Sequence, residues 1–126
     1  MEKPLNFERF TSTGGRFNYT ISLNRSGGFS FNSGFYKKHE LKNFSYVILF
    51  FDRKINAVAF SFVKKQAKES LKISHTKNAT AYVRSNSFVS AYEIKPKIFA
   101  GQYRPREHRT EEGEKLFYIL LEEKKK

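Results

Sequence analysis

The residues best suited to chemistry are concentrated between positions 103 and 109, where three arginines and a tyrosine occur together. Arginine guanidinium groups hold phosphate oxygens through paired hydrogen bonds, and an aromatic ring can stack on a base. Pro105 stiffens the segment, which we expect to be a hairpin loop. The pattern predicts that Tyr103, Arg104, Arg106 and Arg109 contact nucleic acid. The same arginines could instead form weak ion pairs on a solvated loop, with Glu107, Glu111 and Glu112.

Two further groups of basic residues are candidates for the same interface. Lysine acts as a point charge, so such groups would add affinity for the phosphate backbone more than sequence selectivity. One group lies in a polar connector and the other around the first turn and helix: Lys64, Lys65 and Lys68; and Arg16, Arg25, Tyr36, Lys37 and Lys38. Of the aromatic residues near these charges, Tyr36 and Tyr103 are the rings that we expect to be exposed.

The overall charge favours a polyanionic partner. Lysine and arginine number 24 against 12 aspartate and glutamate, a net charge of +12. A field of this sign concentrates nucleic acid near the surface, and we expect DNA rather than RNA. An acidic protein is the alternative partner. No membrane partner is expected, because the longest dense apolar run, Tyr46 to Phe51, is too short to span a bilayer, and we expect a cytoplasmic or nuclear protein.

The residues that could support catalysis are few. Asp52 is the only aspartate and lies in an expected turn, and the chain has no cysteine. The three histidines, His39, His75 and His108, have no spacing that would place two imidazoles on one helix face. We therefore expect no metal, no cofactor and no enzymatic activity. One enzymatic alternative stays open, a metal-independent ribonuclease that uses His108 with Glu107 and the nearby arginines.

The elements that must position these residues are mostly strands. Aromatic residues make up 17% of the chain, which argues against disorder. Apolar and polar residues alternate with a period of two in several segments, as in half-buried strands. Expected strands cover residues 17–23, 29–31, 44–51, 55–63, 71–74, 79–84, 98–103 and 116–121. Short helices are expected over residues 34–41, capped by Asn32 or Ser33, and after Ser85 and Asn86, ending before Pro96.

This order predicts a single α+β domain over residues 1–126 that is mainly β with two short helices. It divides into a leader (1–15), a first ββαββ unit (16–63), a second ββαββ unit (69–121) and a basic tail (122–126). The two units could be pseudo-repeats that form one barrel or one curved antiparallel sheet. Chance repetition of a common β pattern is the alternative, because the halves share almost no residue identities.

The segment from Tyr19 to Phe62 resembles the AbrB/SpoVT class of small DNA-binding domains. The similarity rests on the order of a strand, a glycine turn, a short strand, a capped helix and a closing hairpin, here Ile21–Leu23, Gly27–Phe31, Gly34–Leu41 and Tyr46–Phe62. The resemblance implies a swapped-hairpin barrel, which that class builds from two chains, so a homodimer is compatible with it. It also implies DNA contacts by Arg25, Lys37 and Lys38.

The chain departs from that class where it has Gly28-Phe29 instead of Gly-Arg, and Asn32-Ser33 instead of a proline at the helix start. A rival is the curved antiparallel sheet of Whirly-type proteins, which bind single strands. The expected function is therefore nucleic-acid binding, as a small DNA-binding regulator or a single-strand binder. A protein-interaction or assembly module with an acidic partner is the alternative.

Overall fold

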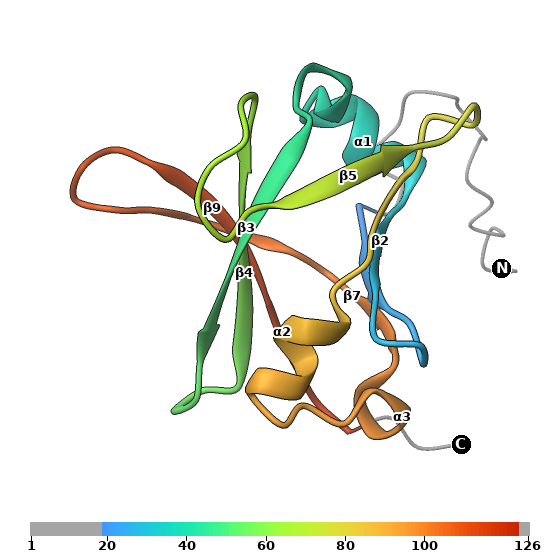
Figure 1. Cartoon of the computed structure of the whole chain (residues 1–126), viewed down its shortest axis with the longest axis vertical. Helices are drawn as coiled ribbons and strands as arrows, with labels where there is room; N and C mark the ends of the chain where they lie inside the picture. The colour runs from blue at the N-terminus through green and yellow to red at the C-terminus, as the bar shows by residue number, and fades with distance from the viewer. Residues whose placement is uncertain (1–18, 124–126) are drawn as a thin grey trace, which may run out of the picture.

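The structure is a computed structural model that describes residues 19–123 and is mainly β, with three short α-helices and one 3-10 helix (Figure 1). The leader, Arg16 and residues 124–126 of the tail lie outside the described residues. In chain order the elements are β1 (Ile21–Leu23), β2 (Phe29–Phe31), α1 (Ser33–Lys38), η1 (Leu41–Asn43), β3 (Tyr46–Asp52), β4 (Ala57–Val63), β5 (Leu71–His75), β6 (Ala81–Val83), α2 (Asn86–Ala91), α3 (Pro96–Phe99), β7 (Gly101–Tyr103), β8 (Arg106–Arg109) and β9 (Lys115–Leu120).

All nine strands belong to one curled antiparallel sheet, in the order β7-β1-β2-β6-β5-β3-β4-β9-β8. The two edge strands, β7 and β8, follow one another in the chain and are separated only by Arg104 and Pro105. The chain therefore passes from one edge of the sheet to the other within two residues, which brings the edges near each other. This half-barrel confirms the expected fold class, a mainly β domain with a curved antiparallel sheet.

The concave side of the sheet holds an aromatic core. Phe29, Phe31 and Phe60 are fully buried and pack edge to face, with ring centroids 5.1 Å (Phe29–Phe60) and 5.5 Å (Phe31–Phe60) apart. Period-two alternation explains this placement, because Phe29 and Phe31 of β2 point inward while Ser30 points outward. Helix α1 covers one end of the curled sheet, and α2 and α3 cover the other (Figure 1).

The two hairpins β1–β2 and β5–β6 are structural repeats. Leu23 pairs with Phe29, and the residues 52 positions later, His75 and Ala81, pair in the same way. The turns match as well, because the Asn24 N–H donates to the Gly28 carbonyl and the Thr76 N–H donates to the Thr80 carbonyl. Both turns contain a residue with positive φ, at Gly27 and at Ala79.

The helices that follow the hairpins repeat with an offset of 53 residues. The His39 N–H donates to the Phe35 carbonyl, and the Tyr92 N–H donates to the Phe88 carbonyl. Each helix is followed by a glutamate in the left-handed conformation, Glu40 with φ of 52° and Glu93 with φ of 56°. Six neighbouring strands of the sheet have the order β7-β1-β2-β6-β5-β3. If β1, β2 and β3 are exchanged with β5, β6 and β7, the result is the same order read in the opposite direction. The structure therefore contains two pseudo-symmetric ββαβ units.

The repeat does not extend to the fourth strand that was expected in each unit, and part of the expected strand pairing is wrong. In the first unit β3 pairs with β4, but β7 pairs with β1, and β9 pairs with β4 and β8. The expected pair of strands 98–103 and 116–121 is therefore wrong. Ile98 and Phe99 belong to α3, whose first residue is Pro96, because proline suits the first helical turn as well as the end of a helix. Helix α1 begins at Ser33 and ends at Lys38, shorter than expected.

Candidate functional site

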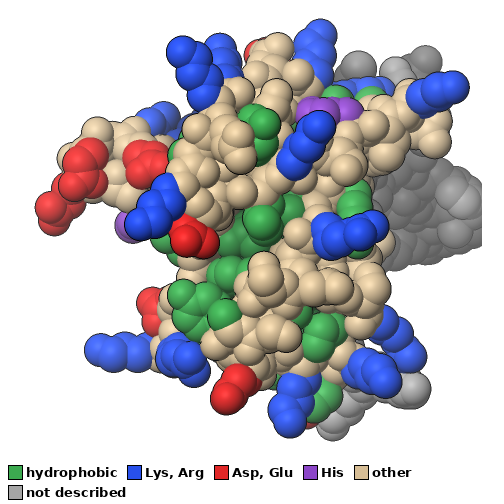
Figure 2. Space-filling model, in the orientation of Figure 1, with side chains coloured by type: hydrophobic (Ala, Val, Ile, Leu, Met, Phe, Trp, Pro, Cys, Tyr) green, Lys and Arg blue, Asp and Glu red, His purple; other side chains and the backbone are tan. Residues whose placement is uncertain are grey.

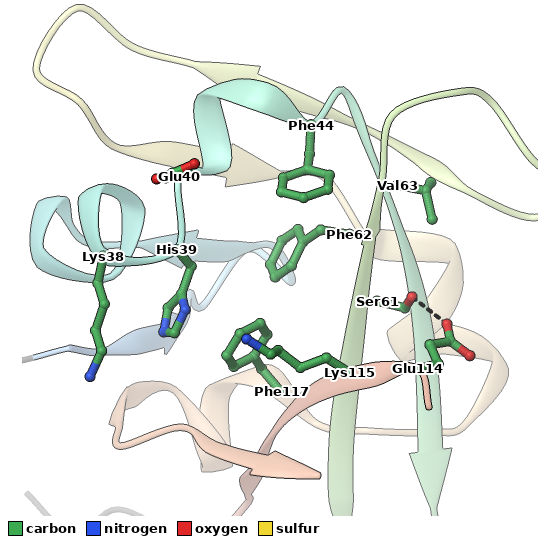
Figure 3. Close-up of a pocket in the computed structure, with 10 residues that line it drawn as sticks. All are labelled: Lys38, His39, Glu40, Phe44, Ser61, Phe62, Val63, Glu114, Lys115 and Phe117. Atoms are coloured by element: carbon green, nitrogen blue, oxygen red, sulfur yellow. Dashed lines mark hydrogen bonds between the residues drawn. The ribbon is translucent and has the colours of Figure 1, made fainter. Parts of the chain in front are cut away.

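A hollow of about 430 Å³ opens between the end of α1, the end of β4 and the start of β9 (Figure 3). We call it the α1 pocket. Figure 3 shows Phe44, Phe62 and Phe117 with His39 on one side, and Ser61, Val63 and Glu114 on the other. Ten residues line it: Lys38, His39, Glu40, Phe44, Ser61, Phe62, Val63, Glu114, Lys115 and Phe117.

Local structure explains why α1 delivers its last residues to this pocket. The Asn32 side chain accepts a hydrogen bond of 2.9 Å from the Phe35 N–H, and this cap begins the helix at Ser33. The left-handed backbone at Glu40 ends the helical run one residue after His39. Lys38, the last residue of α1, and His39, its C-cap, therefore lie at the mouth of the pocket.

Aromatic rings form the floor of the α1 pocket. The Phe62 ring centroid lies 5.9 Å from that of Phe117 and 6.2 Å from that of Phe44, while the His39 and Phe117 rings are 4.3 Å apart. Phe117 is buried, whereas Phe44, Phe62 and His39 are half-buried. The half-buried rings leave aromatic surface open to a planar ligand.

Two lysines flank these rings. Lys38 is exposed and its Nζ lies 4.5 Å from the Tyr19 ring centroid. Lys115 is also exposed, with its Nζ 5.7 Å from the Phe117 ring centroid. Burial lowers the pKa of His39 below its usual range, and the positive charges of Lys38 and Lys115 lower it further, against the opposing effect of Glu107. At neutral pH His39 is therefore uncharged, and the cations at the pocket are the lysines.

The polar wall of the pocket is provided by Ser61 and Glu114. The Ser61 hydroxyl donates a hydrogen bond of 2.6 Å to the Glu114 carboxylate, and Ser61 itself is buried. A carboxylate that accepts one hydrogen bond keeps further lone pairs for another donor. The pocket can therefore stack a planar group on its rings, receive an amino group at Glu114 and hold an anion between its lysines.

The predicted arginine cluster is divided by its backbone. Residues Arg106–Arg109 form the edge strand β8 rather than a loop, and all four are exposed. Neighbours in a strand point to opposite faces, so Arg106 and Arg109 lie on opposite faces of the sheet. Arg104 and Arg106 line one shallow hollow of about 200 Å³, whereas the Arg109 guanidinium donates to the Gly113 carbonyl of its own hairpin. The structure thus brings two of the three arginines together.

The two tyrosines expected to be exposed are buried, so that prediction is wrong. Tyr36 is 8% exposed and shares a hydrogen bond of 2.8 Å with His75 Nδ1. Tyr103 is 5% exposed, and its hydroxyl donates to the Phe99 carbonyl. Rings in the last turn of a short helix or on a strand pack inward here because the small core needs their apolar area.

The remaining predicted basic residues are exposed but only one belongs to the pocket. Lys64, Lys65 and Lys68 follow β4 on the surface, Arg25 lies in the β1–β2 turn, and Lys37 lies on α1. Of all the predicted residues that the structure describes, Lys38 alone lines the α1 pocket. His39, Phe62, Lys115 and Phe117 were missed. The spacing of Lys115 and Phe117, two apart on a strand, was the available signal, because such residues share one face.

The groups proposed for catalysis do not converge. His108 and Glu107 are adjacent on β8 and therefore point to opposite faces. Asp52 has its expected turn role, accepting a hydrogen bond of 2.9 Å from the Lys54 N–H. Among residues 19–123, no group of three histidine, cysteine, aspartate or glutamate side chains is placed to hold a metal ion.

Within the same described range, none of the helices has the length and apolar character needed to cross a membrane. Compared with protein-family models, with curated proteins and with solved structures, the chain has no match.

Proposed function

We propose that this protein binds single-stranded nucleic acid and that the α1 pocket takes one unstacked base. The observation that carries the proposal is the combination of half-buried Phe44 and Phe62 rings with Lys38 and Lys115 around a single hollow of about 430 Å³. Stacking of a base on an aromatic side chain stabilises a complex by about 1–3 kcal/mol. The flanking lysines would hold the phosphates on either side of that base.

The pocket favours a single strand over a duplex. Rings recessed at the bottom of a hollow cannot reach a base inside a stacked helix without extruding it, which costs a few kcal/mol. A single strand presents its bases at far lower cost. The net charge of +12 supplies the general attraction for the backbone, and the exposed Lys64, Lys65, Arg104 and Arg106 would contribute to it.

Fluorescence anisotropy with labelled single-stranded DNA, single-stranded RNA and duplex DNA of equal length, over a series of salt concentrations, tests the proposal. We expect single strands to bind more tightly than the duplex, with DNA first, and affinity to fall steeply with salt. Phe44→Leu and Phe62→Leu remove a ring but keep most of the apolar volume, so each should weaken single-strand binding by about tenfold.

The matched control is Phe50→Leu, which removes a half-exposed ring on the opposite side of the sheet. Thermal unfolding of each variant shows whether the fold is kept. Equal affinity for single strand and duplex, or equal losses in the pocket variants and in Phe50→Leu, would reject the proposal.

A second candidate is a protein-interaction module with an acidic partner, favoured by the outer face of β3, β4 and β9. Paired residues share a face, and the outward residues of these strands are mostly apolar: Ile48, Phe50, Ala59, Leu116, Tyr118 and Leu120. The outward residues of β1, β2, β5, β6 and β7 are instead largely polar: Ser22, Ser30, Ser74, Tyr82 and Gln102.

Exposed Arg53, Lys54 and Arg106 border the apolar face, which would suit a partner with acidic residues around an apolar centre. Binding to an acidic protein that survives nuclease treatment and is lost in Phe50→Ser would favour this candidate over the first.

A further inference from the structure

The second ββαβ unit reproduces the aromatic arrangement that lies beside the α1 pocket. In the first unit, Phe35 of α1 and the C-cap residue His39, four positions later, have ring centroids 4.7 Å apart. Their counterparts 53 residues later are Phe88 of α2 and its C-cap residue Tyr92, with centroids 5.1 Å apart. The repeated backbone hydrogen bonds place both pairs in the same positions of their helices.

Each pair packs against a third ring, which comes from a strand in another part of the chain. At α1 this ring is Phe117, 4.3 Å from His39 and 5.1 Å from Phe35. At α2 it is Phe51, 5.1 Å from Tyr92 and 6.4 Å from Phe88. Neither strand ring comes from the unit whose helix it joins, because Phe117 lies in β9, which follows both units, and Phe51 lies in β3 of the first unit. The triad of rings is thus assembled twice by different parts of the chain.

A cation accompanies both triads. Lys115 lies two residues before Phe117, with its Nζ 5.7 Å from that ring. Arg53 lies two residues after Phe51, and its guanidinium carbon is 5.4 Å from the Tyr92 ring centroid. A guanidinium over a tyrosine ring is a favourable cation–π contact, and the same plane can stack on a base or hold a phosphate.

The triad at α2 is the more open of the two. Phe51, Phe88 and Tyr92 are all half-buried and Arg53 is exposed, whereas Phe35 and Phe117 are buried. In Figure 2 apolar side chains form a band in the middle of the face that carries α2 and β3, with lysine and arginine side chains, and also acidic ones, around it. Two exposed basic residues, Arg84 and Lys95, lie on either side of α2 in the sequence.

We propose that Phe51, Phe88, Tyr92 and Arg53 form a second stacking site for a base of the same nucleic-acid strand that enters the α1 pocket. This inference rests on the proposed function. Charge favours this occupant, because exposed Arg53, Arg84 and Lys95 lie near half-buried rings in a chain of net charge +12, which suits a polyanion with planar groups. The two helices lie at opposite ends of the curled sheet, so one strand that reaches both gains avidity (Figure 1).

A tryptophan reporter at position 92 tests this site directly. The chain has no tryptophan, so Tyr92→Trp introduces a single indole whose fluorescence is quenched when a base stacks on it. We expect quenching by a long oligothymidylate of about 20 nucleotides. The control Tyr118→Trp, on the apolar outer face, should keep its fluorescence. Binding detected by anisotropy without quenching at position 92 would overturn the second site while leaving the proposed function intact. Absence of any binding would overturn both.

Arg53→Gln provides a measurement that does not depend on the reporter. Arg53 is exposed in the β3–β4 turn, so its replacement should leave the fold unchanged. We expect Arg53→Gln to weaken binding of the long oligothymidylate about tenfold and to weaken binding of a short one of about 4 nucleotides much less, because only the long one can reach both sites at once. Equal weakening of both lengths, or of neither, would contradict a second site on the same strand.

Discussion

The two ββαβ units share a backbone but differ in what their helix ends offer to a ligand. The end of α1 combines buried rings, a histidine with a lowered pKa, two lysines and the Ser61–Glu114 pair around a hollow. The end of α2 combines more open rings with a single arginine. The repeat therefore places two rings at equivalent positions of each unit. The strands that pack against each helix differ, and they determine whether the rings lie in a recessed pocket or on an open surface.

The hairpin turns of the two units differ at one equivalent position, Gly27 in the first and Ala79 in the second. Substitutions at this position should give the largest expected effect, a change in the free energy of unfolding. Gly27 has a φ of 99°, and an added Cβ would lie 2.9 Å from the Asn86 side-chain oxygen. Gly27→Ala should lower the free energy of unfolding by about 1–3 kcal/mol, because that conformation is strained for any residue with a Cβ.

Its counterpart Ala79 adopts a φ of 59°, within the left-handed region that alanine can occupy. Ala79→Gly should change stability by less than about 1 kcal/mol. Urea denaturation of both variants checks the comparison, and equal destabilisation would contradict the different roles assigned to the two turns.

Removing the two lysines of the α1 pocket should give the next largest effect, a loss of affinity for single strands. The double substitution Lys38→Ser and Lys115→Ser should weaken single-strand binding at least about tenfold and reduce the slope of log affinity against log salt by about 1.4, since two phosphate contacts are lost. The matched variant Lys64→Ser with Lys65→Ser removes the same charge from the surface after β4. If both double variants weaken binding equally, net charge alone accounts for affinity and the pocket has no special role.

The smallest expected effect is a pH dependence of single-strand affinity that comes from His39. Its counterpart in the second unit, Tyr92, cannot gain a charge in the same way. His39 is neutral near neutral pH because burial lowers its pKa. When the pH falls through this lowered pKa, His39 gains a proton beside Lys38 and Lys115, so single-strand affinity should rise by a few fold. His39→Gln should show a smaller rise in anisotropy titrations. An identical pH profile would remove His39 from the phosphate-binding part of the site.

The same lowered pKa has an opposite consequence for the free protein. The unfolded chain binds a proton at His39 more readily than the folded chain, so this residue's contribution to stability is present above about pH 6.5 and is lost as the pH falls. Thermal unfolding should therefore show a larger loss of stability on acidification for the wild-type chain than for His39→Gln. A larger loss in the variant would contradict the burial argument.

Local patterns in the sequence predicted much of the fold. The expected strands 17–23 and 29–31 contain β1 and β2, whose alternate residues Ile21, Leu23, Phe29 and Phe31 are buried. Of the two expected caps, Asn32 and Ser33, it is Asn32 that caps α1. Strand β8 was missed because its four residues are polar and exposed on an edge, where charged side chains discourage pairing with other chains and leave no apolar alternation to read. The repeat was visible only as element order, since backbone hydrogen bonds and not side-chain identities carry it.

The candidate site was harder to predict because it joins three distant segments. Lys38 and His39, Phe62, and Lys115 with Phe117 come together only through the pairing of β4 with β9 and the packing of α1 against both. The arginines around position 105 were the strongest candidates in the sequence because they are close together in the chain. In the structure, however, Arg106 and Arg109 lie on opposite faces of β8. Basic residues that are close in the sequence therefore predicted a charged surface, but they did not predict the pocket.

The account depends most on the α1 pocket, and amide chemical-shift mapping with a single-stranded oligonucleotide tests it most directly. Titration into ¹⁵N-labelled protein at moderate salt should shift the amide signals of Lys38, His39, Phe44, Phe62, Lys115 and Phe117 first and most strongly. Shifts confined to Arg104–Arg109 and Lys64–Lys68, with the pocket signals unchanged, would show binding through surface charge alone and would contradict the central claim.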